Sequence, residues 1–136
     1  MRKRYGLDIE RQLVRQFRER GAYSERRPRS LGGTDVLRIY DNEIWLIQSK
    51  TTSKRYLYIP KDEVEKLLKD REVMKRNLSK FDIPIKAIFY VARIISPAKG
   101  RKARRISRYL EVSEVKGETL KVQFEPFKAE WLNRRS

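Results

Sequence analysis

Apolar residues recur at helical spacing in two stretches of this chain. The first stretch covers residues 6–20, and Gly21 follows it as a typical helix stop. Its apolar stripe consists of Ile9, Leu13, Val14 and Phe17. The second stretch covers about 61–78, and Pro60 suits the first position of its helix. Its stripe consists of Val64, Leu67, Leu68, Val73 (or Met74) and Leu78. The pattern therefore predicts two helices.

Apolar runs and alternating segments predict strands between and after these helices. The strands are expected at about 34–39, 43–50, 85–95, 106–115 and 119–124, with residues 51–59 continuing extended. The first two flank a tight Asp41-Asn42 turn, which makes them a β-hairpin. The continuous run Ile44–Ile47 indicates a strand covered on both faces. This order predicts an α/β fold with a mixed central β-sheet flanked by helices.

The remaining segments are expected to be irregular. Two basic loops are predicted at 22–33 and 96–105, and a C-terminal extension at 125–136 is expected to hold a short helix. The chain has 136 residues, of which 39% are hydrophobic, enough for one core. We therefore predict a single domain over residues 1–136.

The net charge of the chain says more about its function than its length does. The chain has 34 Lys and Arg against 18 Asp and Glu, a net charge of +16, which favours a nucleic-acid partner. A thermophile surface explains many charges but not this imbalance. Cysteine and histidine are absent, which excludes disulfides, histidine bases and Cys or His metal sites. No apolar run approaches 18 residues, so we expect no membrane span and an intracellular, cytoplasmic, nucleoid-associated protein.

One group of polar residues on the predicted hairpin could carry chemistry. Asp35 opens the first strand, and Gln48-Ser49-Lys50 ends the second. Alternation puts Gln48 and Lys50 on one face. The Asp35 carboxylate, the Gln48 amide oxygen and the Ser49 carbonyl could bind a hard cation such as Mg²⁺, while Lys50 orients water or stabilises a charged transition state. The alternative is a turn aspartate beside a strand that ends in solvent.

Two further residues could join this group. Glu10 lies beside the apolar stripe of the first helix, a place that unpaired carboxylates avoid. Alternatively it pairs with Arg11 or Arg15. Ser30, in the first basic loop, could contact a substrate phosphate or simply cap a turn.

In their order and spacing, these residues resemble the PD-(D/E)xK nuclease superfamily and, within it, the archaeal Holliday junction resolvases and their viral relatives. The resemblance covers about residues 2–70. It begins with Arg2-Lys3-Arg4-Tyr5-Gly6 and Glu10-Arg11-Gln12-Leu13, and continues with Arg20-Gly21-Ala22-Tyr23. Arg26, Ser30, Asp35, Gln48-Ser49-Lys50 and Tyr56-Leu57-Tyr58-Ile59 complete the series. The chain departs from the pattern at Gln48, where the family has Asp or Glu.

The resemblance implies a restriction-endonuclease-like fold and a homodimer that nicks four-way junctions symmetrically with Mg²⁺ or Mn²⁺. It gives catalytic roles to Glu10, Ser30, Asp35, Gln48 and Lys50, and metal binding to Glu10, Asp35, Gln48 and Ser49. An apolar dimer patch is expected on the helix at 61–78 and the strand at 85–95. Two other functions stay open: a different nuclease of the superfamily, and a junction-binding protein that cuts weakly or not at all because of Gln48.

Contacts with DNA are expected from basic residues near the N-terminus, in the two basic loops and in the segment at 51–59. The residues are Arg2, Lys3, Arg4, Arg11, Arg26, Arg27, Arg29, Lys54, Arg55, Lys99, Arg101, Lys102, Arg104 and Arg105.

Overall fold

The structure is a computed structural model that describes residues 2–27, 33–97, 100 and 102–133, with side chains from residue 8 onward. Its elements, in chain order, are α1 (Arg2–Glu19), β1 (Tyr23–Arg26), β2 (Val36–Tyr40), β3 (Glu43–Thr52), β4 (Tyr56–Pro60), α2 (Lys61–Asn77), β5 (Ile85–Ile95), β6 (Arg104–Val112), β7 (Thr119–Phe124) and β8 (Phe127–Leu132). Within this described part, no helix is long and apolar enough to cross a membrane.

The strands form two sheets. The larger sheet has five strands in the order β1-β2-β3-β5-β6, and the smaller has three in the order β4-β7-β8. Strands β3 and β5 are parallel, while the other pairs of the larger sheet are antiparallel. The predicted mixed central sheet is therefore confirmed.

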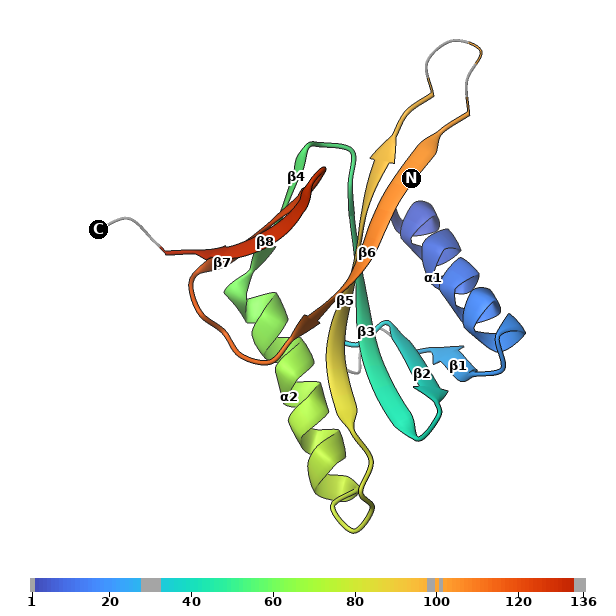
Figure 1. The fold of residues 1–136 in the computed structure, drawn as a ribbon, viewed down its shortest axis with the longest axis vertical. Helices are drawn as coiled ribbons and strands as arrows, with labels where there is room; N and C mark the ends of the chain where they lie inside the picture. The colour runs from blue at the N-terminus through green and yellow to red at the C-terminus, as the bar shows by residue number, and fades with distance from the viewer. Residues whose placement is uncertain (1, 28–32, 98–99, 101, 134–136) are drawn as a thin grey trace.

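The molecule has three layers, with the larger sheet in the middle (Figure 1). Helix α1 covers one face, where its predicted stripe packs on Val36, Ile47 and Ile88. Helix α2 and the smaller sheet cover the other face, where Leu46 and Phe89 are fully buried. Strand β3 is covered on both faces, as the apolar run in its sequence predicts, because Leu46 and Ile47 enter opposite cores.

An aromatic cluster fixes α1 on the sheet. The Tyr109 ring centroid lies 6.0 Å from Phe17, 5.5 Å from Trp45 and 5.3 Å from Tyr90. Burial raises the pKa of Tyr109 to about 12, so this phenol packs in its neutral form. The Arg38 guanidinium lies 4.1 Å from the Trp45 ring centroid. These contacts hold the helix that carries Glu10.

Several predicted elements are wrong or displaced. The basic loop at 22–33 contains β1, a short edge strand whose one buried residue, Ser24, donates its hydroxyl to the Leu37 carbonyl at 2.8 Å. The loop at 96–105 ends two residues earlier, because Arg104 and Arg105 belong to β6. That strand ends at Val112 rather than at 115.

The C-terminal extension forms strand β8, not a helix. The alternation of FKAEWL explains this, because Phe127, Ala129 and Trp131 pack on the core while the residues between them are exposed. Pro60 lies one position earlier than expected, at the N-cap of α2. Strand β5 lies between β3 and β6 and is largely buried, so it cannot provide the dimer patch that we expected there.

Candidate active site

The hairpin of β2 and β3 positions the Asp35 carboxylate. Its turn has positive φ at Asp41 (51°) and Asn42 (61°), as the Asp-Asn pair predicts. The Asp35 amide donates to the Ile47 carbonyl at 2.8 Å, and Asp35 Oδ2 accepts from the Ser49 amide at 2.9 Å. Because the N–H and C=O of one strand residue point to the same side, the Ser49 carbonyl points toward Asp35 as well.

Gln48 and Lys50 extend from the face of β3 that α2 covers, the same face as buried Leu46. Both contact one carboxylate of α2. Gln48 Nε2 donates to Glu63 Oε1 at 3.2 Å, and Lys50 Nζ forms an ion pair with the same oxygen. The side chains of Lys50 and Glu63 are each about three-quarters buried, 25% and 26% exposed.

Glu63 was not among the residues predicted for the site, although the sequence contains a signal for it. Glu63 precedes Leu67 by four residues, and Leu67 is fully buried in the core under α2. Residues four apart share one helix face, so Glu63 is expected to lie against the sheet.

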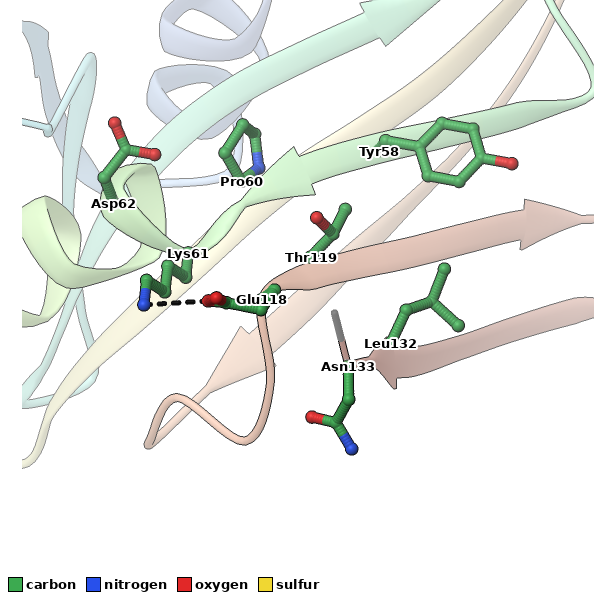
Figure 2. A pocket seen from close by; sticks show the side chains of 8 residues that line it. All are labelled: Tyr58, Pro60, Lys61, Asp62, Glu118, Thr119, Leu132 and Asn133. Atoms are coloured by element: carbon green, nitrogen blue, oxygen red, sulfur yellow. Dashed lines mark ion pairs between the residues drawn. The ribbon is translucent and has the colours of Figure 1, made fainter. Parts of the chain in front are cut away.

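The ion pair between Lys61 and Glu118, at 2.8 Å, and the hydrogen bond from the Lys61 amide to the Glu118 carbonyl, at 3.0 Å, fix the start of α2 (Figure 2). Figure 2 shows the hollow beside this pair, which none of the predicted site residues lines.

The oxygen atoms at this site fit a hard divalent cation. Gln48 Oε1 is buried, and no atom of the described residues donates a hydrogen bond to it. Together with the Asp35 carboxylate and the Ser49 carbonyl, it offers the kind of oxygen that Mg²⁺ prefers. Over the described ranges, no group of three or more His, Cys, Asp or Glu side chains could hold a metal ion. The donor set is therefore less anionic than a cluster of carboxylates.

Glu10 approaches from the other side of the sheet. Its Oε1 lies 3.8 Å from Arg26 Nε, so Glu10 contacts an arginine of β1, whereas the alternative from the sequence was Arg11 or Arg15 of its own helix. The next residue, Arg27, donates its amide to the Asp35 carbonyl at 2.8 Å. Neighbouring residues at the end of β1 thus contact Glu10 and Asp35. Asp35, Gln48, Ser49 and Lys50, in contrast, all lie at one end of the β2–β3 hairpin.

The segment before Asp35 packs tightly on α2. Thr34 Oγ1 donates to Asp70 Oδ2 at 2.8 Å. A Cβ built on Gly33 would lie 2.9 Å from the Leu67 amide nitrogen, closer than real Cβ contacts. Glycine at position 33 therefore allows the backbone that leads into Asp35 to approach the helix that carries Glu63.

We expect Gly33→Ala to lower stability by roughly 1–3 kcal/mol, because α2 must shift to admit the methyl group. The same shift should slow any reaction that depends on the distance between Asp35 and Glu63. Thermal unfolding and DNA cleavage by the folded protein are the measurements. Gly21→Ala is the control, since the positive φ of Gly21 (93°) makes alanine strained there while a Cβ would meet nothing within 4 Å, so α2 and the Asp35–Lys50 contacts are left in place. Equal cleavage by both variants would contradict this expectation.

The basic residues expected to contact DNA fall into three groups. Arg11 and Arg26 line one hollow with Arg15 and Arg18. Two residues at the loop end of the β5–β6 hairpin have side-chain partners: Arg105 Nη1 donates to Gln12 Oε1 at 2.7 Å, and Arg104 Nη2 lies 3.9 Å from Glu125 Oε2. In the third group, Lys54, Arg55 and Lys102 are exposed and Arg27 is partly exposed. Ser30, Arg29, Lys99 and Arg101 lie outside the described residues, as do the side chains of Arg2, Lys3 and Arg4.

Comparisons with known proteins agree with this architecture. The family model described as archaeal Holliday junction resolvase (Hjc) matches residues 1–123. Among solved structures, Hjc of Archaeoglobus fulgidus, a Holliday junction resolvase from an archaeal hyperthermophile, is similar with a TM-score of 0.56 and 19% identity. That likeness covers 91% of this chain and 90% of the other, and at this identity it shows a shared fold. No match was found among curated proteins.

Proposed function

This chain belongs to the archaeal Holliday junction resolvase family, and we propose that it resolves four-way DNA junctions by metal-dependent paired nicks at the Asp35–Lys50 edge of β3. The observation that supports the assignment of the site is that the Asp35 carboxylate accepts from the Ser49 amide, between Gln48, whose buried amide oxygen has no hydrogen-bond partner among the described residues, and Lys50, which pairs with Glu63. Family membership supports the nuclease activity and the junction substrate.

Asp35, Gln48 and the Ser49 carbonyl would hold Mg²⁺ or Mn²⁺, with Glu10 contributing from α1. A divalent cation bound there supplies Lewis-acid activation of the phosphodiester and of water. Lys50 would place its positive charge beside the phosphate and stabilise the negative charge that develops in the transition state. Its ion pair with Glu63 fixes the position of the ammonium before DNA binds. Ser30 is proposed to contact the phosphate from the first basic loop.

DNA binding is proposed to begin at the arginine-lined hollow between α1 and β1. Arg11, Arg15, Arg18 and Arg26 line it, and Arg26 also contacts Glu10, so the hollow borders the proposed metal site. Arginines suit phosphate oxygens because their planar donors bind them in pairs. The loop end of the β5–β6 hairpin, with Arg104 and Arg105, provides a second basic surface.

We also propose a homodimer, because a junction with two-fold symmetry is best matched by a two-fold protein. With β5 buried, the remaining part of the expected patch is the outer side of α2. Val73 on this helix is 43% exposed, and Phe81 just beyond it is 61% exposed. An apolar contact between two copies would cover them.

The proposal predicts that the protein cuts an immobile four-way junction in Mg²⁺ or Mn²⁺ much faster than a linear duplex of the same sequence. Paired nicks should appear at symmetric positions, measured by strand-specific end labels on denaturing gels. Equal rates on both substrates would point to another nuclease of the superfamily. Tight junction binding without nicks at any Mg²⁺ or Mn²⁺ concentration would instead make the protein a binder inactivated by Gln48.

A further inference from the structure

We propose that Glu63 is a positioning residue that orients the Gln48 amide so that its oxygen, and not its nitrogen, is presented to a divalent cation. The inference rests on the metal-dependent cleavage proposed above and extends the site to a residue on α2. It also explains how a glutamine can stand at a position where the family has a carboxylate.

The contacts of Gln48 are divided unequally between its two polar atoms. Nε2 donates to Glu63 Oε1 at 3.2 Å, whereas Oε1 is buried and receives no hydrogen bond from any described residue. A buried acceptor without a partner is unfavourable, so such atoms are uncommon in folded proteins. A cation at this point would satisfy the oxygen.

A neutral amide presents a problem that a carboxylate does not. Both oxygens of a carboxylate can bind a cation, whereas rotation of a glutamine amide by half a turn would point its NH₂ group at the metal. An ionised carboxylate accepts hydrogen bonds and donates none, so Glu63 can contact only the nitrogen of Gln48. The Glu63 contact therefore selects the rotation in which the oxygen remains free to coordinate.

Glu63 also contributes negative charge beside a site that lacks it at position 48. The same oxygen that accepts from Gln48 pairs with Lys50 Nζ, so one carboxylate fixes both residues of the motif. Val64 and Leu67 hold α2 on the core, and the backbone hydrogen bond from Lys61 to Glu118, at 3.0 Å, joins the start of this helix to the smaller sheet beside their ion pair (Figure 2). Partners around a ligand, like this one, commonly change metal affinity by about 10- to 100-fold.

The test is Mn²⁺ binding to the intact protein without DNA, measured by isothermal titration calorimetry. Four proteins are compared: the wild type, Glu63→Gln, Gln48→Glu, and the variant with both changes. We expect Glu63→Gln to weaken Mn²⁺ binding by about 10- to 100-fold in the wild-type background. In the Gln48→Glu background the loss should be about threefold or less, because a carboxylate at position 48 has no nitrogen to turn toward the metal.

Glu65→Gln is the matched control, since Glu65 lies on the same helix and is exposed. It removes the same charge and should leave Mn²⁺ affinity unchanged. Glu63→Asp provides a second variant that keeps the charge but withdraws the carboxylate by one methylene, and it should also weaken binding. Circular dichroism and metal-free junction binding establish that each variant is folded.

The outcomes separate this inference from the function on which it rests. If the wild type binds Mn²⁺ and cuts junctions, but Glu63→Gln binds Mn²⁺ as tightly, the positioning role is wrong and the proposed function stands. An equal loss in both backgrounds would also overturn the role, because the charge of Glu63 would then account for its effect. If the wild type neither binds Mn²⁺ nor cuts, the proposed function fails and the inference fails with it.

Discussion

Asp35→Asn should lower the rate of junction cleavage by roughly 10³-fold, which corresponds to about 4 kcal/mol of lost transition-state stabilisation. The substitution removes a negative charge from the proposed metal site while preserving the shape of the side chain. An asparagine oxygen can still accept the hydrogen bond that Asp35 Oδ2 accepts from the Ser49 amide at 2.9 Å. The hairpin and the DNA-binding surface should therefore persist, and junction affinity without metal should be close to that of the wild type.

Single-turnover cleavage in Mn²⁺ and gel-shift titrations in EDTA measure these two quantities separately. Asp41→Asn is the matched control, because it makes the same chemical change in the exposed turn of the same hairpin. Asparagine adopts the positive φ of that turn at least as readily as aspartate, so the control should fold and cut normally. Cleavage by Asp35→Asn within tenfold of the wild type would mean that the metal site lies elsewhere.

The sequence predicted most of the fold because its two periodicities are strong. The strands at 85–95 and 119–124 have the predicted bounds, and the helix predicted at 61–78 is α2. The stripe of α1 is buried where the helical period places it, and in the stripe of α2 Val64 and Leu67 are buried, whereas Val73 is exposed. These elements bury large apolar side chains at regular spacing, and burial is the dominant favourable contribution to folding.

The main errors concern two edge strands, β1 of the larger sheet and β8 of the smaller sheet. Strand β1 has a polar sequence with one buried side chain, Ser24, and exists because its backbone pairs with β2. Strand β8 forms because the exposed edge of β7 was open to a further strand. A polar edge strand such as β1 depends on a partner elsewhere in the chain, which local periodicity does not reveal, whereas the alternating apolar residues of 127–132 are a local signal for β8.

For the candidate site, the sequence predicted the neighbours along the hairpin but not the partner across the layers. Asp35, Gln48 and Lys50 come together because an antiparallel register and a period of two are local rules. The contact with Glu63 depends instead on how α2 lies on the sheet, a tertiary arrangement fixed by Val64 and Leu67 in the core. Strand β4 lies between Lys50 and Glu63 in the chain, so the sequence order does not indicate that these two residues are in contact.

Lys50→Met should reduce the cleavage rate by roughly 10²- to 10³-fold while leaving metal binding intact, a combination that Asp35→Asn cannot produce. Methionine keeps an unbranched apolar side chain of similar length but removes the positive charge proposed to stabilise the transition state. Because that charge also repels a cation and pairs with Glu63, Mn²⁺ affinity should stay the same or rise. Calorimetry with Mn²⁺ and single-turnover cleavage on the same preparation distinguish the two effects.

Lys69→Met is the control for this prediction. It removes an exposed charge from α2 and should change neither the Mn²⁺ affinity nor the cleavage rate. If Lys50→Met lost Mn²⁺ affinity as strongly as Asp35→Asn, Lys50 would act by holding Glu63 and Gln48 in place rather than by meeting the phosphate.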